Sequence, residues 1–361
     1  MTKGGECVKN FALLQGKLMQ PQSDIQERKN QHLDLALKAQ MASALKDQRF
    51  SYEPLLKGHP TEAQILKERA FLGKSILAPL WISSMTGGSD KAQTINKRLA
   101  QIAGEFGLGM GLGSCRVLLE APERFNDFDL RGLLGDARPF YANLGLAQIE
   151  QMLALGETDR INNMVEKLRC DGLIIHVNPL QEWFQVGGDR IERPPLETIE
   201  GLLEHFKFPV VIKEVGQGMG PASLRELLKL PIRGIEFAAF GGTNFTQLEA
   251  LRSERPMPNR LNELSCVGHT AEEMVIEVNQ LLSTFENDNT SPKGGHEFII
   301  SGGIKSFLEG FYLMKKLNAP CIYGQAKAFL VAADRGEEEL RQFVRQQLES
   351  LALAEQYLVV N

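Results

Sequence analysis

A repeated alternation of short apolar runs and longer amphipathic segments, beginning near residue 76, constrains this chain most. Apolar runs separated by helical patterns are typical of parallel βαβ units. Eight such runs are present, at residues 76–83, 107–113, 139–143, 172–178, 209–215, 234–240, 297–300 and 321–323. Eight strands with intervening helices predict an α/β chain that forms a (β/α)8 TIM barrel.

Helical periodicity fills the intervals between these runs, at residues 92–106, 159–168, 196–206, 224–230, 271–285 and 307–317. The chain has 361 residues, whereas a basic barrel needs about 250, so two extensions remain. Residues 1–75 form an N-terminal extension with an expected helix at 25–45, and residues 336–361 contain an amphipathic helix at 337–358. We expect a single domain with the barrel at 76–335, flanked by these extensions, and an insertion at 253–270.

Composition excludes several classes of protein. Forty basic against 45 acidic side chains give a net charge of -5, so the chain lacks the broad basic surface of a nucleic-acid-binding protein. No apolar run reaches the roughly 18 residues of a membrane span, and the N-terminus has no apolar signal region. Five widely spaced cysteines match neither a disulfide framework nor a zinc site. We expect a cytoplasmic protein with reduced thiols.

All eight predicted strands end in glycine or polar residues, and in a barrel these ends meet on one face. Each motif alone is an ordinary glycine turn, but their recurrence on every strand predicts a binding site there. Ser301-Gly302-Gly303-Ile304 and Gly324-Gln325-Ala326 follow the last two strands, where barrels build a phosphate cradle from backbone N–H groups and a helix N-terminus.

Polar side chains expected at this face include Asn143, Lys213 and the segment from His176 to Glu182. A lysine that ends an apolar strand needs either an anionic ligand or a neighbouring carboxylate, and spacing alone leaves both open. His176 and Asn178 face the same side of one strand, with Gln181 and Glu182 following within a turn. A lone histidine is more often a core residue, whereas Glu182 in this cluster is a candidate Mg2+ ligand.

Three basic residues are candidates for binding an anionic group. They are Arg28, Lys29 and Arg116. The alternative is that they lie on a solvent-exposed helix face, which is the usual interpretation of a basic pair. Cys115 has the chemistry of a nucleophile, but no feature indicates a lowered thiol pKa, which favours a passive thiol. The sequence contains no P-loop and no GxSxG elbow.

The combined motifs, over about residues 24 to 330, resemble the type 2 isopentenyl diphosphate isomerase family, the flavin-dependent kind. They are Arg28-Lys29-x-x-His32, Met85-Thr86-Gly87-Gly88, Gly113-Ser114-x-Arg116, Ala142-Asn143-Leu144-Gly145, His176-x-Asn178-Pro179-Leu180-Gln181-Glu182, Gly188-Asp189-Arg190, Lys213-Glu214-Val215-Gly216, Gly241-Gly242-Thr243 and Ser301-Gly302-Gly303.

The resemblance implies a cofactor, a metal and a substrate. FMN would bind to Ser84, Met85, Thr86, Ser114, Asn143, Lys213, Thr243, Gly302, Gly303, Gln325 and Ala326. The small-molecule diphosphate substrate would bind to Arg28, Lys29, Ser114, Cys115, Arg116, His176, Asn178 and Gln181. Mg2+ would bind to Glu182, and His176, Gln181 and Lys213 would be catalytic. Family members are commonly tetramers or octamers, so the resemblance also implies a homo-oligomer.

The implied reaction is a 1,3-allylic proton shift that converts isopentenyl to dimethylallyl diphosphate without net redox change. In the family the flavin is reduced, normally by NADPH, and acts as acid and base. This fits a sequence with no acidic protein group poised to protonate an alkene. Departures from the family pattern occur at Cys115, Gly187 and Ala238, where Gln, Glu and Ser are usual, and at the bulky Trp183.

Two alternatives remain at the level of sequence. Cys115 beside Gly113-Ser114 is similar to the loop of the inosine monophosphate dehydrogenase kind of barrel, although one residue of that loop is missing. A non-catalytic barrel that binds a phosphorylated ligand is the other. A purified protein that shows no FMN absorbance, even after FMN is added, would exclude the isomerase interpretation.

Overall fold

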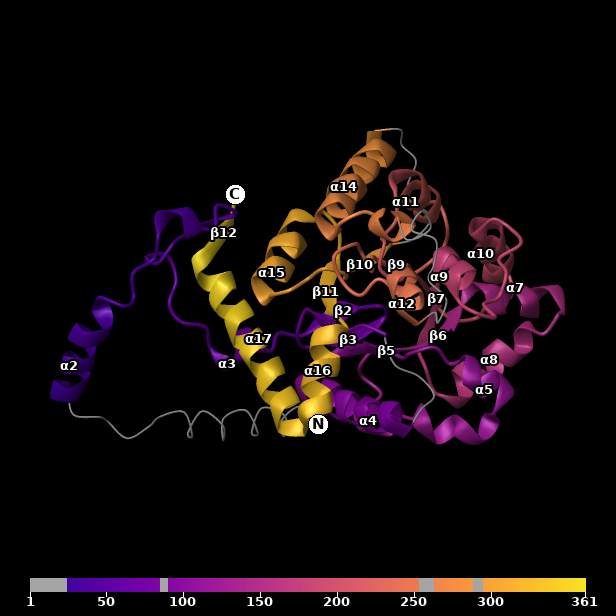
Figure 1. The fold of residues 1–361 in the computed structure, drawn as a ribbon, viewed down its shortest axis with the longest axis horizontal. Coiled ribbons are helices and arrows are strands. Elements are labelled where there is room, and N and C mark those ends of the chain that lie inside the picture. The colour runs from indigo at the N-terminus through magenta and orange to yellow at the C-terminus, as the bar shows by residue number, and fades with distance from the viewer. Residues whose placement is uncertain (1–24, 85–89, 253–262, 288–294) are drawn as a thin grey trace. The chain divides into compact units, whose positions relative to one another are not determined.

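A computed structural model describes residues 25–84, 90–252, 263–287 and 295–361 (Figure 1). The chain divides into two compact units, one of residues 1–53 with 358–361 and one of residues 54–357. Met85, Thr86 and most of the insertion at 253–270 lie outside the described residues. Within the described residues, no helix combines the length and apolar character needed to span a membrane.

The larger unit contains a closed barrel of eight parallel strands that follow one another around the barrel in chain order. The strands are β4 (Leu80–Ile82), β5 (Gly109–Gly111), β6 (Phe140–Gly145), β7 (Gly172–His176), β8 (Val210–Lys213), β9 (Gly234–Glu236), β10 (Glu297–Ile300) and β11 (Cys321–Gln325). The (β/α)8 barrel predicted from the apolar runs is confirmed.

Helices connect consecutive strands and lie outside them, as α14 and α15 do beside β10 and β11 in Figure 1. They are α4 (Asp90–Phe106), α5 (Arg116–Glu120), α6 (Arg131–Leu134), α7 (Leu146–Ala154), α8 (Thr158–Lys167), α9 (Pro179–Phe184), α10 (Pro195–Leu203), α11 (Pro221–Leu228), α12 (Phe245–Arg252), α14 (Ala271–Asn287) and α15 (Phe307–Lys316). Helix α16 (Lys327–Arg335) follows the last strand, β11. The expected C-terminal helix is α17 (Glu337–Tyr357), which contacts α4, α15 and α16.

A hairpin of β2 (Arg69–Phe71) and β3 (Lys74–Ile76) closes the barrel at the amino ends of its strands. Its turn residues Leu72 and Gly73 have φ values of 49° and 77°, the left-handed pair that a type I′ hairpin requires. Leu72 is held in this costly conformation because its N–H donates to Glu297 Oε2 at 2.9 Å and its carbonyl accepts from the Tyr141 hydroxyl at 3.3 Å.

The buried cluster at this end joins the hairpin to inward-facing strand residues. Its members are Phe71, Leu72, Ile76, Trp81, Tyr141, Ile174, Val211, Ile299 and Ile322. Because these side chains fill the lower part of the barrel, any ligand site is confined to the opposite, carboxyl end of the strands.

Two expected elements differ in the structure. The apolar run at 76–83 is split, since Ile76 ends β3 and the barrel strand β4 begins at Leu80, after Pro79, which has no N–H for a strand ladder. The helix expected at 25–45 is also wrong in length, because α2 (Ile25–Ala36) ends early and only a 3-10 turn (Ser43–Leu45) follows. Residues 29–46 are exposed, so propensity alone does not extend the helix.

The smaller unit also contains a strand pair that the apolar pattern did not predict. β1 (Phe50–Tyr52) pairs antiparallel with β12 (Leu358–Val360), which joins segments from opposite ends of the chain. This pairing places the last residues of the chain in the same unit as the N-terminal extension.

Leu72→Ala is expected to lower the free energy of unfolding by about 2–4 kcal/mol, because it removes a buried side chain from the closed end of the barrel. Urea denaturation followed by circular dichroism measures the change. Leu55→Ala, at a residue 93% exposed, is the matched control and should change stability by less than about 0.5 kcal/mol. Equal effects of the two substitutions would show that the hairpin does not stabilise the barrel.

Candidate active site

On several strands, an apolar side chain that faces the barrel interior is followed, two residues later, by a polar side chain that faces the same way. Alternate residues of a strand face the same side, so each polar residue stands above an apolar one of the buried cluster. The pairs are Trp81 and Ser83, Tyr141 and Asn143, Ile174 and His176, Val211 and Lys213, and Ile299 and Ser301. With Glu236, the register partner of Lys213, these upper residues form what we call the polar layer.

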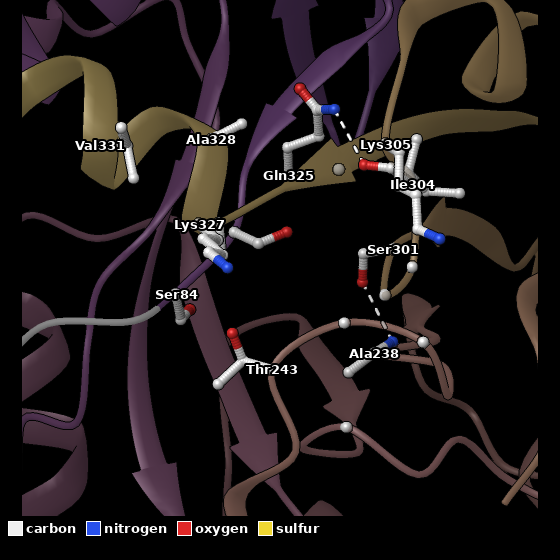
Figure 2. Close-up of a pocket in the computed structure, with 18 of the residues that line it drawn as sticks. Ser84, Ala238, Thr243, Ser301, Ile304, Lys305, Gln325, Lys327, Ala328 and Val331 are labelled. Atoms are coloured by element: carbon white, nitrogen blue, oxygen red, sulfur yellow. Dashed lines mark hydrogen bonds between the residues drawn. The ribbon is translucent and has the colours of Figure 1, made fainter. Parts of the chain in front are cut away.

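A cavity of about 790 Å³ opens above part of this layer, at the carboxyl ends of β4, β8, β9, β10 and β11. Figure 2 shows Ser84, Thr243, Ser301 and Lys327 around the same space. Polar-layer residues in the lining are Ser83, Lys213, Glu236 and Ser301. The strand-end loops add Ser84, Ala238, Gly241, Gly242, Thr243, Gly302, Gly303, Gly324, Gln325 and Ala326.

The glycine loop after β10 packs closely against the loop after β9. Gly302 and Gly303 have φ values of 85° and 74°, and a Cβ at Gly302 would lie 2.1 Å from the backbone nitrogen of Ala239. No side chain fits there without moving backbone. With no side chain at either position, the backbone of this loop is accessible from the cavity that both glycines line, and backbone N–H groups are suited to an anion.

Helix α16 points its N-terminus at the same cavity. Its N-cap residue is Ala326, whose side chain has no capping oxygen, so the first-turn N–H groups receive no side-chain cap. An anion in the cavity would satisfy these groups and interact favourably with the helix dipole. The cavity therefore has two backbone elements suited to a phosphate, as expected from residues 301–304 and 324–326.

The side chain of Gln325 links the loop after β10 to helix α17 through hydrogen bonds. Its Nε2 donates to the Ile304 carbonyl at 3.0 Å, as Figure 2 shows, and its Oε1 accepts from Gln347 Nε2 of α17 at 3.0 Å. Gln347 Oε1 in turn accepts from the Tyr323 hydroxyl at 2.8 Å. Both polar ends of the Gln325 side chain are used in this network, so its backbone is the part available to a ligand.

Several polar atoms in the cavity lining are buried without a partner among the described residues. These are Ser83 Oγ, Ser84 Oγ and Glu236 Oε2. Lys213 is also buried, and its ammonium donates to the Glu214 carbonyl at 2.8 Å. Buried polar atoms are ordinarily hydrogen-bonded, so this wall is suited to a ligand that carries several polar groups.

His176 and Asn143 form the next part of the polar layer. Asn143 Nδ2 donates to the Leu112 carbonyl at 3.0 Å, which turns its Oδ1 toward His176 Nδ1 at 2.8 Å. Burial, together with the charge of Lys213, lowers the pKa of His176 to about 3. The ring is therefore neutral near pH 7, with its proton on Nδ1 and a lone pair on Nε2.

Asn178 orients the carboxylate expected to bind metal. It precedes α9 and its Nδ2 donates to Gln181 Oε1 at 3.1 Å and to Glu182 Oε1 at 3.0 Å. Glu182 Oε2 accepts from the backbone N–H of Asp189 at 2.9 Å. Asn178 Oδ1 is buried without a partner among the described residues, and each Glu182 oxygen retains a lone pair. Asn178 thus turns its amide nitrogen, not its oxygen, toward the Glu182 carboxylate.

Asp189 links this carboxylate to a cation expected to bind substrate. Its Oδ2 accepts from Arg116 at 2.6 Å and from Gln148 at 2.8 Å, and Gln151 donates to its Oδ1 at 3.3 Å. Burial would raise the pKa of Asp189, but these hydrogen bonds and the Arg116 charge outweigh it and lower the pKa. Arg116 also pairs with Glu120 at 3.1 Å, so a diphosphate would compete with two carboxylates for it.

Cys115 and Ser114 have contrasting surroundings. The Cys115 thiol is fully buried and donates to the Gly113 carbonyl at 3.5 Å, and burial raises its pKa to about 12. It stays protonated near pH 7 and is not a nucleophile, in line with the passive thiol expected. Ser114 is exposed at the end of the same strand.

The structure distributes the predicted residues over two neighbouring groups. The cavity lining contains Ser84, Lys213, Thr243, Gly302, Gly303, Gln325 and Ala326. The ends of β5, β6 and β7 and the start of α9 carry Ser114, Cys115, Arg116, Asn143, His176, Asn178, Gln181 and Glu182. Lys213 joins the groups, because it lines the cavity and is the register partner of His176. Arg28 and Lys29 lie on α2, in the other unit.

Sequence reasoning missed Glu236, although a signal for it exists. It is a charged residue inside the apolar run at 234–240, the same pattern that singled out Lys213. Among the residues that the structure describes, no three His, Cys, Asp or Glu side chains cluster as metal ligands.

Comparison with curated proteins relates the whole chain to one kind of enzyme. A Synechococcus protein named isopentenyl-diphosphate delta-isomerase is 36% identical over 338 residues, which are 92% of each chain. Proteins of that name from Rickettsia typhi and Rickettsia felis are 32% and 33% identical, over 93% and 91% of this chain and 94% and 91% of their own. No family model matches the chain.

Solved structures match the fold at low sequence identity. A flavocytochrome b2 mutant with benzoylformate has a TM-score of 0.55 at 15% identity, covering 86% of this chain and 75% of its own. A mandelate oxidase mutant with a monooxide FMN adduct has a TM-score of 0.50 at 11% identity, covering 87% and 89%. These likenesses support the barrel fold, and the near full-length identity to curated enzymes shows that the chain belongs to the isopentenyl-diphosphate delta-isomerase family.

Proposed function

We propose that the protein converts isopentenyl diphosphate to dimethylallyl diphosphate with reduced FMN in the cavity and Mg2+ at Glu182. Family membership supports the reaction, and one of the solved barrels of similar fold is named with an FMN adduct. The observation that carries the proposal is the position of Lys213. Its buried ammonium lies between a cavity with two phosphate-binding backbone elements and the cluster of His176, Asn143 and α9.

The cavity residues fit the three parts of FMN, which are its phosphate, its polar ribityl chain and its flavin ring. The Gly302–Gly303 loop and the α16 N-terminus would hold the phosphate. Ser84, Lys213 and Thr243 would contact the remainder, and the unpartnered oxygens of Ser83 and Ser84 are buried acceptors and donors for its polar groups. When bound and reduced, with NADPH as reductant, FMN supplies the acid and base for the proton shift.

The substrate diphosphate would be bound by residues outside the cavity lining. Arg116 and Gln181 can donate to its oxygens. His176 is neutral with a lone pair on Nε2, so in the free protein it offers the diphosphate no proton from that atom. Glu182 would hold Mg2+, which neutralises diphosphate charge when bound.

The isomerisation adds one proton to the terminal alkene carbon and removes one from the carbon two positions away, so atoms and electrons balance. Neither the Cys115 thiol, whose pKa is about 12, nor the neutral His176 ring is an acid suited to protonate an alkene. The residues that line the site would orient the substrate and shield its carbon skeleton from water. The charge of Lys213 favours an electron-rich group beside it.

Turnover under defined conditions tests the proposal. Protein loaded with FMN, kept anaerobic with NADPH and Mg2+, should convert isopentenyl diphosphate to the dimethylallyl product, detected by proton NMR. Omission of NADPH or removal of Mg2+ with EDTA should abolish conversion. Conversion that persists without flavin would refute the cofactor assignment, and absence of product from flavin-loaded, reduced protein would refute the reaction.

Glu182→Gln is expected to raise the Mg2+ concentration for half-maximal turnover by about tenfold or more, because a neutral amide is a weaker ligand than a carboxylate. A Mg2+ titration of the initial rate measures this, with FMN affinity expected to stay unchanged. Glu200→Gln on the exposed side of α10 is the matched control. An unaltered Mg2+ dependence would remove Glu182 as the ligand.

Gly303→Ala is expected to weaken FMN binding by about tenfold while riboflavin binding changes little. An alanine here would have to adopt a left-handed φ, and its Cβ would lie 3.0 Å from the Phe240 carbonyl oxygen. The loop must therefore shift, which moves its N–H groups away from the phosphate. Quenching of flavin fluorescence gives both dissociation constants. Gly132→Ala, where a Cβ meets nothing within 4 Å, is the control. Equal losses for both flavins would place the phosphate elsewhere.

A further inference from the structure

Glu236 is a fully buried carboxylate of the polar layer with one oxygen left over. Its Oε1 accepts from the Ser301 hydroxyl at 3.1 Å, and Ser301 Oγ also accepts from the Ala238 N–H at 3.0 Å, the bond drawn in Figure 2. Glu236 Oε2 has no hydrogen-bond partner among the described residues, and Glu236 lines the cavity. One oxygen is thus held by the protein while the other is left without a protein donor.

A second buried carboxylate shows that this barrel can satisfy such a group when its role is structural. Glu297, at the closed end of the barrel, accepts from the Leu72 N–H at 2.9 Å and pairs with Arg233 at 2.7 Å, both through Oε2. Among the described residues, Glu236 has no comparable ion pair. The ammonium of Lys213, its register partner, donates to the Glu214 carbonyl. Leaving a buried carboxylate oxygen unpaired is costly, which points to a donor from outside the protein.

We propose that Glu236 is a ligand-binding residue whose Oε2 accepts a hydrogen bond from an N–H or O–H group of the molecule in the cavity. Lys213, its register partner on β8, lines the same cavity and carries a cationic donor. The pair therefore selects a ligand that carries a donor next to an acceptor or anionic group. The inference rests on the proposed flavin site, since a flavin offers an imide N–H between two carbonyls and hydroxyls on its ribityl chain.

The test measures flavin affinity of the folded protein by fluorescence quenching. Glu236→Gln removes the charge at nearly constant volume, and it should raise the dissociation constant of oxidised FMN by about tenfold or more, because a charge-assisted hydrogen bond is lost. Glu236→Met, which has no acceptor, should weaken binding at least as much. Glu297→Gln is the matched control: it should lower the urea midpoint and leave FMN affinity within about twofold of the wild type.

Lumiflavin, which has the ring but no ribityl chain, separates the two possible donors. If Glu236→Gln weakens both FMN and lumiflavin, the ring N–H is the donor, whereas a loss confined to FMN identifies a ribityl hydroxyl. Either result supports the proposal. Wild-type affinity for FMN in both Glu236 variants would overturn it and leave the flavin site standing, whereas a wild-type protein that binds no flavin would overturn both.

Discussion

The interior of this barrel depends on the alternation of side chains along short parallel strands. Each strand has few inward positions between its ends, and the lower ones are filled by the apolar cluster that includes Trp81, Tyr141 and Val211. The next inward position on several of the same strands is polar, which places Ser83, Asn143 and Lys213 directly above that cluster. One geometric rule thereby provides both a dry core and, above it, the polar layer on which a ligand can rest.

The polar layer is buried, so the charged forms of its side chains are less stable than they would be at the surface. His176 stays neutral because burial and the neighbouring Lys213 charge both oppose protonation. Glu236 keeps an unpartnered oxygen, whereas Glu297 at the opposite end forms an ion pair with Arg233 and accepts from the Leu72 N–H. A buried carboxylate oxygen that lacks a protein donor and lines a cavity is typical of a site completed by its ligand.

Closure of the lower end carries its own cost. Leu72 occupies a left-handed conformation that glycine adopts freely, and three tertiary features hold it: burial of the side chain, the bond to Glu297 and the bond from Tyr141. Local preference alone would not place leucine there. The hairpin therefore depends on the barrel as much as the barrel depends on the hairpin.

The sequence by itself determined the strand count, the barrel, the polar chemistry at the strand ends and the family, because periodicity and motifs are local properties of the chain. It did not determine that helix α2 stops at Ala36, since residues 29–36 have good helix propensity but are exposed.

Only the tertiary structure decided which polar groups meet. Asn143 and His176 are 33 residues apart, Glu236 and Ser301 are 65 apart, and Arg116 and Asp189 are 73 apart. A periodic pattern states which side of a strand a residue faces, but not which partner lies across the barrel. These spatial contacts determine the charge of His176, the orientation of Glu182 and which oxygen of Glu236 has no protein donor. Hydrogen bonds and burial act over a few ångströms in space and not along the chain.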